Sequence, residues 1–349
     1  MKNNNKILFS IIIPTYKKPK DLKLAIVSVL NQSLKEFELI VIDDASRDNT
    51  KKTVKSFKDK HIVYIENKVN IGVALNIKKG FKMAKGKYVF LLGDDDIILR
   101  KDTLSAVYNE MENSDAGYSQ LGYIYFENNM RKPSFINNPY NSIIYFSPSK
   151  DILIKTLNLH FGSMSGSIFR KKLIKQSDII NNIWWIYFIA LYKSLFSHGC
   201  LYIGNHFILA KISRIGNISY VDIKKNKGFY LNQLLEIYKK FDSSPKRRSL
   251  FLKSRLDIIV DTLPGIKYYS STKNIIQIIK ETIELHKDYI FEFKFLFNVF
   301  IAIFCPKIML SILRKIRIFV GSYQIRGYLK KINFDTYIED FMYNVAANN

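Results

Sequence analysis

Three consecutive aspartates, Asp94 to Asp96, are the residues of this chain that most clearly suggest chemistry. Adjacent carboxylates repel one another, so a nearby cation stabilises their ionised forms. Oxygen ligands at a strand end suit Mg²⁺ or Mn²⁺, which use few protein ligands and keep coordination sites for phosphate oxygens. A solvated acidic turn that caps the following helix is the alternative interpretation. The surrounding sequence distinguishes the metal site from the solvated turn.

A second acidic pair, Asp43–Asp44, also follows an apolar run. The runs 37–42 and 88–92 are typical of buried parallel strands, and Gly93 ends the second of them. The carboxyl ends of parallel strands meet at one edge of a sheet, where ligands bind. We therefore expect both acidic pairs at the same edge. One pair could hold the sugar and base of a nucleotide, and the other a metal-bound diphosphate.

The elements that must position these acids alternate between strand and helix over residues 7–92. Apolar runs predict the strands, and i, i+3, i+4 spacing and turn residues predict the helices. This alternation predicts an α/β fold with a doubly wound, mostly parallel sheet. Pro14 is expected to stop the first strand, because its ring nitrogen cannot donate to a ladder. The expected strands are 7–13, 37–42, 61–65 and 88–92, and the expected helices are 21–32, 46–57 and 70–84.

Composition limits the class of protein. The chain has 349 residues, of which 48% are hydrophobic, and a formal net charge of +24 that implies an anionic partner. Nucleic acid, anionic lipid and phosphorylated substrates all qualify, but the charges are spread through the chain and no nucleic-acid motif is present. Cys200 and Cys305 lie far apart, which favours a reducing compartment. We find no secretory signal and no apolar run of the roughly 18–20 residues that a spanning helix needs.

Several ordered motifs resemble the family 2 glycosyltransferases, closely over about residues 7–130 and loosely over 160–220. The version around the aspartates looks most like the abequosyltransferase-like branch of surface polysaccharide enzymes. The motifs that carry the resemblance are Ser10–Tyr16, Ser28–Ser33, Phe37–Thr50, Asn70–Gly72, Ala84–Val89 and Gly93–Asp96.

The resemblance implies a GT-A fold, a nucleotide-diphospho-sugar donor, inversion at the anomeric carbon and a Mn²⁺ or Mg²⁺ cofactor. It implies that Tyr16 packs on the base in a pocket lined by Pro14 and Thr15, and that Asp44 accepts a hydrogen bond from the base beside Asp43. A packed aromatic and a helix-capping carboxylate are the alternatives for Tyr16 and Asp43. The metal would bind Asp95, with Asp94 at the metal or ribose and Asp96 in support. Further donor-binding candidates are Asn70, Gly72 and Arg214.

The chain departs from the family pattern at three places. Gly93 replaces the usual first carboxylate of the acidic motif, and Leu75 stands where an arginine is common. Diphosphate contacts would then come from Lys78 or Arg214. An inverting transfer needs a group that takes the proton of the acceptor hydroxyl, yet no acid stands near 183–185. The candidate bases are Asp178 and His160.

The expected organisation is a GT-A domain over residues 1–222 and a helical, basic C-terminal region over 223–349. The nucleotide-sugar half would span about 7–126 and the acceptor half about 127–222. Trp184 and Trp185 could stack on sugar rings or pack in the core. Basic and bulky apolar residues within 308–320 favour a helix at an anionic bilayer or one packed on the first domain.

The function expected from these features is transfer of one sugar to a growing, lipid-linked surface glycan, without a nucleic-acid partner. The enzyme would be cytoplasmic and peripheral at the inner face of the cell membrane. Two alternatives stay open: transfer to a protein or teichoic-type acceptor, and a non-catalytic relative that binds nucleotide sugar.

Overall fold

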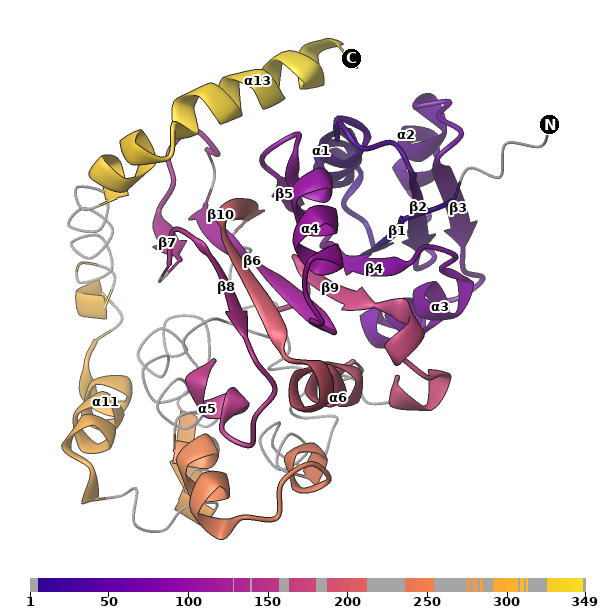
Figure 1. The fold of residues 1–349 in the computed structure, drawn as a ribbon. Helices are drawn as coiled ribbons and strands as arrows, with labels where there is room; N and C mark the ends of the chain where they lie inside the picture. The colour runs from indigo at the N-terminus through magenta and orange to yellow at the C-terminus, as the bar shows by residue number, and fades with distance from the viewer. Residues whose placement is uncertain are drawn as a thin grey trace. The chain divides into compact units, whose positions relative to one another are not determined.

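The structure is a computed structural model built around one large mixed sheet (Figure 1). Its strands lie in the order β3-β2-β1-β4-β9-β6-β10-β5, with β7 paired to β6 and β8 paired to β10. The residues that the structure describes are 6–127, 129–138, 140–156, 163–179, 187–211, 236–253, 275–276, 279–280, 283–284, 291–306, 308–310, 312 and 325–347.

The first half of the sheet confirms the predicted strand–helix alternation. β1, β2, β3 and β4 are parallel to one another, and every residue of β1, β2 and β4 is buried. Pro19 begins α1, whose buried positions include Leu22, Ala25, Ile26 and Val29. The elements are β1 (Phe9–Thr15), α1 (Pro19–Leu30), β2 (Phe37–Asp43), α2 (Thr50–Ser56), β3 (Ile62–Glu66), α3 (Val73–Met83) and β4 (Tyr88–Leu91).

The strand order creates a switch point between β1 and β4. The chain proceeds from β1 to β2 and β3 on one side, and β4 is added on the other side of β1. In open α/β sheets the crevice beyond the carboxyl ends of the strands at such a point is where ligands bind. Thr15 ends β1 and Leu91 ends β4. The aspartates that follow β4 therefore enter this crevice.

Pro14 does not end the first strand, contrary to the expectation from the sequence. β1 continues to Thr15, and Pro14 pairs in register with Ile42 of β2. Ile12 accepts a hydrogen bond from Leu92 on the β4 side, whereas Thr15 accepts one from Asp44 on the β2 side. Because neighbouring residues of a strand bond to opposite sides, the missing N–H of Pro14 faces the β4 side, beyond Leu91, where the pairing of β4 has ended.

The second half of the sheet is mixed. β9 runs antiparallel to both β4 and β6, while β6 and β10 run parallel to each other. β7 lies within the polar stretch 127–141. The elements are β5 (Asp96–Ile98), α4 (Thr103–Glu112), β6 (Tyr118–Phe126), β7 (Phe135–Asn137), β8 (Ile143–Phe146), α5 (Ile152–Lys155), β9 (Ser167–Arg170), α6 (Phe188–His198) and β10 (Cys200–Lys211).

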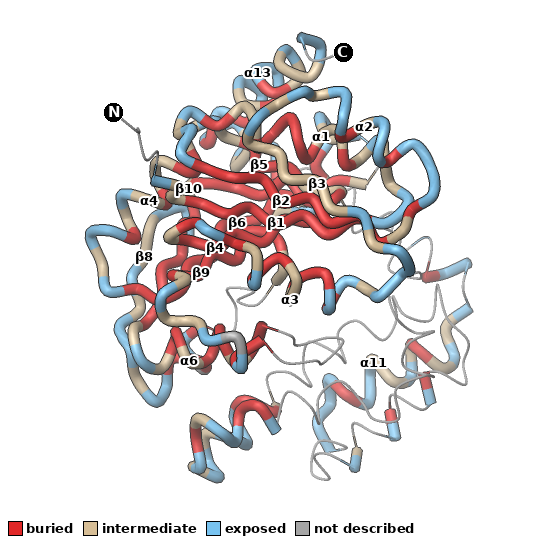
Figure 2. The backbone as a smooth tube through the Cα atoms, turned by 90° about the vertical axis from the view of Figure 1, so that its right-hand side faces the viewer, coloured by how far each residue is buried: buried red, intermediate tan, exposed pale blue. Residues whose placement is uncertain are grey.

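The chain forms two compact units, and the domain boundary expected between 222 and 223 stays a prediction. Residues 1–211 and 325–349 form one compact unit, and residues 212–324 form the other. The first unit includes α13 (Phe334–Ala347), which contacts α1. Phe334, Ile338 and Phe341 of this helix are buried in a cluster with strand residues such as Phe207. The sequence near the C-terminus thus completes the core of the sheet-containing unit, whose central strands are almost wholly buried (Figure 2).

The second unit contains α11 (Phe293–Phe304), a helix of Phe, Ile and Leu with a single lysine. Among the residues that the structure describes, no helix combines the length and the hydrophobicity that crossing a bilayer requires.

Burial of His206 in β10 predicts a pH-dependent stability. Burial, with a smaller effect of nearby Arg100, lowers the pKa of His206 from 6.5 to about 4. Between these values the unfolded chain binds the extra proton, so the free energy of unfolding decreases as the pH falls from 6.5 to 4, by up to about 3 kcal/mol. We expect His206→Gln to lose this slope when urea unfolding is measured across that range. The raised pKa of Asp96 gives a slope of opposite sign in both proteins, so the difference between them reports His206. Equal slopes would contradict the assignment.

Candidate active site at the carboxyl edge of the sheet

Two of the three aspartates converge on a single cation, the ammonium of Lys18. Lys18 Nζ lies 3.2 Å from Asp94 Oδ1 and 2.7 Å from Asp95 Oδ2. Asp94 Oδ2 also accepts a hydrogen bond of 2.9 Å from the hydroxyl of Thr15 and one of 3.4 Å from the backbone N–H of Tyr16. The end of β1 and the turn after β4 are therefore joined through these carboxylates. Sequence reasoning placed Thr15, Asp94 and Asp95 here but missed Lys18.

The electrostatics of this cluster favour a bound cation. Burial raises the pKa of Asp94, and the ammonium of Lys18 offsets only part of that shift. Burial lowers the pKa of Lys18, but Asp94 and Asp95 outweigh it, so the pKa is raised well above its usual value. The lysine therefore stays protonated at neutral pH. Its charge stabilises two neighbouring carboxylates that would otherwise repel each other.

The third aspartate, Asp96, faces different partners. Ser165 donates a hydrogen bond to Asp96 Oδ2 and accepts one of 2.8 Å from the N–H of Gly93, while Lys211 N donates to Asp96 Oδ1 over 3.1 Å. Burial, together with the charge of Asp95, raises the pKa of Asp96 to about 7. Asp96 therefore connects the acidic turn to the residues before β9 and to the end of β10. This fits the supporting role expected for it.

The missing side chain of Gly93 has a steric reason in this structure. A Cβ at Gly93 would lie 2.9 Å from Asp96 Oδ2, 3.1 Å from Ser165 Oγ and 3.4 Å from Asp95 Oδ1. Carboxylate and hydroxyl oxygens already occupy the space that a side chain at this position would enter. The chain therefore places its acids at 94–96 without one at 93.

The carboxylate of Asp43 accepts hydrogen bonds from Ser46, which follows β2, and from Tyr64 of β3. Its Oδ1 accepts hydrogen bonds of 2.9 Å from Ser46 N and 2.5 Å from Ser46 Oγ, and its Oδ2 accepts one of 2.6 Å from the hydroxyl of Tyr64. Burial, followed by the effect of Asp43, raises the pKa of Tyr64. Asp43 therefore stabilises the turn after β2, and it lies six residues before Asn49, the N-cap of α2. It does not cap that helix.

Asp44 organises the loop before α3. Its Oδ1 accepts hydrogen bonds of 2.8 Å from Ile71 N and 3.0 Å from Asn67 Nδ2, and its Oδ2 accepts one of 2.8 Å from Gly72 N. Gly72 has a φ of 85°, a conformation that favours glycine. Asn67 was not expected as a member of the site. The loop 67–72, which includes the exposed Asn70, is thereby anchored at the carboxyl edge of β2.

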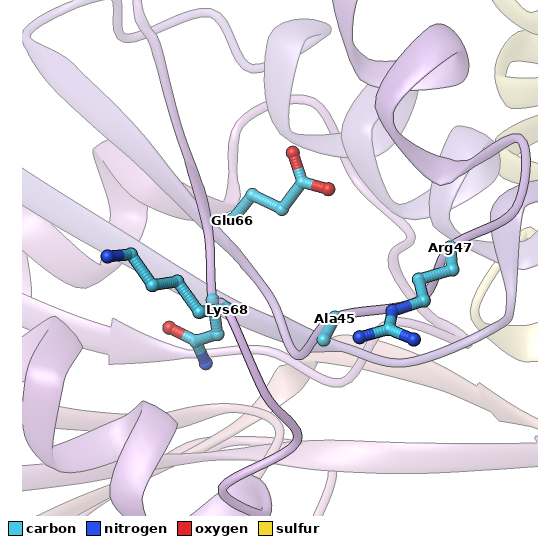
Figure 3. Close-up of a pocket in the computed structure, with 5 residues that line it drawn as sticks. Ala45, Arg47, Glu66 and Lys68 are labelled. Carbon is cyan, nitrogen blue, oxygen red and sulfur yellow. The ribbon is translucent and has the colours of Figure 1, made fainter.

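A cavity of about 290 Å³ opens beside this loop, beyond the ends of β2 and β3. Figure 3 shows Arg47 and Lys68 on either side of the opening, with Ala45 between them. Asn67, which binds Asp44, also lines the cavity. Tyr16, which follows β1, exposes 42% of its surface, as a platform for a base requires. Glu66 also lines the cavity, but its carboxylate is paired with Lys51, so Arg47 and Lys68 suit the opening to an anionic ligand.

The remaining predicted site residues are not brought to this edge or lie outside the described residues. Asp178 Oδ2 accepts hydrogen bonds from Lys193 Nζ over 2.8 Å and from Lys175 N over 2.7 Å. Asp178 follows β9, whose last residue, Arg170, pairs with Tyr88 at the opposite edge of β4 from the aspartates. The carboxylate of Asp178 is therefore paired with Lys193 of α6, and its role as the catalytic base stays a prediction. The candidates outside the described residues are His160 and Arg214, together with Trp184 and Trp185.

The residues present at the acidic turn fit a divalent cation in part. Among the described residues no group of three or more His, Cys, Asp or Glu side chains is arranged to hold a metal ion. Mg²⁺ and Mn²⁺ sites that use one or two carboxylates plus substrate phosphates need only two protein ligands. Asp94 and Asp95 meet that requirement, because one ammonium already bridges them.

A doubly wound sheet with paired carboxylates at its switch point defines the fold class as GT-A. Residues 10–177 match the model of the family described as "Glycosyl transferase family 2". The chain is therefore a glycosyltransferase with a family 2 domain. The narrower resemblance to the abequosyltransferase-like branch stays a prediction.

Two curated relatives share this region. The chain is 32% identical over 196 residues to an uncharacterised glycosyltransferase of Methanocaldococcus jannaschii, covering 53% of this chain and 66% of that protein. It is 29% identical over 234 residues to a GalNAc(5)-diNAcBac-PP-undecaprenol beta-1,3-glucosyltransferase of Campylobacter jejuni, covering 64% and 71%.

Two solved structures share the fold. One is residues 1–349 of TarS from S. aureus, with a TM-score of 0.57, 16% identity and coverage of 93% of this chain and 92% of that chain. The other is the mannosyltransferase PcManGT of Pyrobaculum calidifontis in complex with GDP-Man and Mn²⁺, with a TM-score of 0.53, 13% identity and coverage of 85% and 86%. At these identities the likeness establishes the fold alone.

The position of Lys18 predicts how the acidic turn binds metal. Lys18→Met removes the ammonium that bridges Asp94 and Asp95, so we expect the affinity for Mn²⁺ without nucleotide to increase roughly tenfold, or about 1.4 kcal/mol. Isothermal titration with Mn²⁺ measures this directly. Lys20→Met, which removes the same charge from an exposed position of α1, is the matched control and should change the affinity little. Equal Mn²⁺ affinity for wild type and Lys18→Met would show that the ammonium and the metal do not share these oxygens.

Proposed function

We propose that this glycosyltransferase moves one sugar, with inversion, from a nucleotide-diphospho-sugar to a growing glycan on a lipid-diphosphate carrier. The observation that carries the proposal is the convergence of Asp94 and Asp95 on one cation at the switch point. The undecaprenol-linked acceptor in the name of the Campylobacter relative supports the choice of a lipid carrier. We also propose that the enzyme works in the cytoplasm, at the inner face of the membrane.

The donor would lie across the edge of the sheet. Tyr16 and the cavity beside Asp44 would receive the nucleoside, and the diphosphate would extend toward the acidic turn. Asp94 and Asp95 would hold Mn²⁺ or Mg²⁺ there, and the metal would neutralise charge on the leaving diphosphate. Lys18, displaced from the carboxylates, lies near enough to donate a hydrogen bond to a phosphate oxygen. The loop 67–72, held by Asp44, closes the site on the β3 side.

Each residue contributes a defined physical effect in this scheme. Thr15 and the N–H of Tyr16 fix the orientation of the Asp94 carboxylate, so its second oxygen faces the cation. Asp96 fixes the acidic turn through Ser165 and Lys211. Positioned groups of this kind stabilise developing charge because they need no reorganisation during the reaction.

A thermal-shift screen with UDP, GDP, CMP and dTDP, each with and without Mn²⁺, tests the donor site. A ligand that binds only the folded protein raises its apparent stability by mass action. We expect one nucleotide to raise the melting temperature, and Mn²⁺ to increase the shift. No shift with any nucleotide would contradict the proposal. A shift without turnover on any lipid-linked, protein or teichoic-type acceptor would favour the non-catalytic alternative. The anomeric configuration of the product, determined by NMR, tests inversion.

A further inference from the structure

The helix α11 exposes a stripe of large apolar side chains along one face. Phe293, Phe297, Phe300 and Phe304 recur at helical spacing, and each exposes between 52% and 80% of its surface. Leu296 is 53% exposed beside them. At about 100° per residue these five positions span roughly 100° of the helix circumference. We name this set of five residues the aromatic stripe.

The opposite face of α11 is buried. Phe295 is 3% exposed and Ala302 is fully buried, and both lie about 180° around the helix from the stripe. Figure 2 shows buried and exposed positions alternating along α11. The helix is therefore anchored by one apolar face while a second apolar face stays in contact with water. Exposed apolar patches of this kind on a folded protein mark an interaction surface.

The aromatic rings of the stripe contact one another. The ring centroids of Phe293 and Phe297 are 6.0 Å apart with an interplanar angle of 19°, and those of Phe300 and Phe304 are 5.2 Å apart at 38°. The exposed apolar surface continues past the helix at Ile308, Met309 and Ile312, each more than half exposed. It is therefore an extended surface rather than a few scattered side chains.

The sequence segment that contains the stripe is basic, and its charge indicates the kind of partner. Within the second unit, residues 293–324 contain five lysine or arginine residues and no aspartate or glutamate. A second copy of the chain would bring an equal positive charge to the same surface and be repelled. An anionic bilayer would attract that charge and also receive the phenylalanines at the boundary between headgroups and acyl chains.

We propose that the aromatic stripe of α11 is a membrane-binding surface, which inserts into the interface of an anionic bilayer without crossing it. The inference rests on the proposed peripheral location of the enzyme and names the residues responsible. Binding would hold the enzyme at the surface where a lipid-linked acceptor is found. The attraction combines burial of the stripe with neutralisation of nearby lysines and arginines, so it should weaken as salt is added.

Co-sedimentation of the full chain with vesicles, in the absence of nucleotide, tests the proposal. We expect binding to phosphatidylcholine vesicles that contain about a third phosphatidylglycerol to be at least about tenfold tighter than binding to phosphatidylcholine alone. The double substitution Phe297→Ser and Phe300→Ser should weaken binding to the anionic vesicles at least about tenfold. The matched control is Leu250→Ser with Tyr343→Ser, two exposed apolar residues outside α11, which should bind as the wild type does.

Each alternative gives a different result. Wild-type-like binding by the stripe variant, or no binding by the wild type, would overturn the proposal. A wild-type dimer that the stripe substitutions convert to a monomer in sedimentation velocity would assign the stripe to a second copy and overturn it too. The nucleotide-induced thermal shift of the stripe variant should equal that of the wild type. A lost donor site is thereby distinguished from a lost membrane surface.

Discussion

Asp95→Asn is expected to reduce the rate of sugar transfer by at least about 10²-fold, because an amide is a much poorer ligand than a carboxylate for the metal that we propose to neutralise the leaving diphosphate. The fold should persist, since the substitution keeps the shape of the side chain and removes a charge that repels Asp94 and Asp96. Steady-state turnover with saturating donor and Mn²⁺ measures the rate. Urea unfolding should show a change in the free energy of unfolding within about 1 kcal/mol.

The control for this prediction is Asp335→Asn, the same chemical change at an exposed acid in the first turn of α13. It should leave turnover unchanged. The Mn²⁺-dependent part of the nucleotide thermal shift should disappear in Asp95→Asn and persist in Asp335→Asn. Full turnover by Asp95→Asn would remove Asp95 from the metal site. If the wild type keeps its full turnover after EDTA has chelated the metal, the reaction does not depend on a metal.

Asp44→Ala destabilises the protein by about 2–4 kcal/mol and abolishes the nucleotide-induced shift. The substitution leaves the N–H groups of Ile71 and Gly72 and the amide of Asn67 without their acceptor. Leaving polar groups of this kind unpaired costs roughly 1–3 kcal/mol each, and water can form hydrogen bonds to some of them. Asp44→Asn keeps one acceptor oxygen and should cost about half as much. Urea unfolding with and without nucleotide measures both effects.

Asp48→Ala is the matched control, because Asp48 lies in the same loop but is exposed and accepts hydrogen bonds from the N–H and the hydroxyl of Thr50. It should cost about 1 kcal/mol and leave nucleotide binding intact. The experiment also separates two roles of Asp44. If Asp44→Ala retained full stability but lost nucleotide binding, the carboxylate would act on the base, as the resemblance implies, rather than on the loop.

The arrangement of residues 7–92 could be predicted because local patterns determine it. Each parallel strand is a continuous apolar run that only a buried position explains, and such strands place their carboxyl ends at one edge. The pairs Asp43–Asp44 and Asp94–Asp95 were predicted to lie at one edge of the sheet for that reason, and in the structure Thr15, which ends β1, donates a hydrogen bond to Asp94. Pro14 was misjudged because its effect depends on which neighbour its nitrogen faces.

The site residues that the sequence analysis did not identify are brought together by contacts between residues far apart in the chain. Lysines occur at 17, 18 and 20, and no local pattern shows that Lys18 alone reaches the aspartates. Ser165 meets Asp96 across 69 positions, and Asn67 meets Asp44 across 23. Asp178 was selected for its place in the sequence, and a nearby lysine of α6 binds it. A sequence pattern does not encode such pairings.

Because α13 belongs to the first unit, the core of that unit is completed only after residues 212–324 have been translated. The residues that cover Phe207 and its neighbours lie at 332–341, after an intervening stretch of more than a hundred residues. While a ribosome is still translating 212–324, that apolar surface of the nascent chain has no cover and is open to chaperones or to aggregation. A transcript that ends before residue 325 would yield a chain with all ten strands and a persistently exposed core surface.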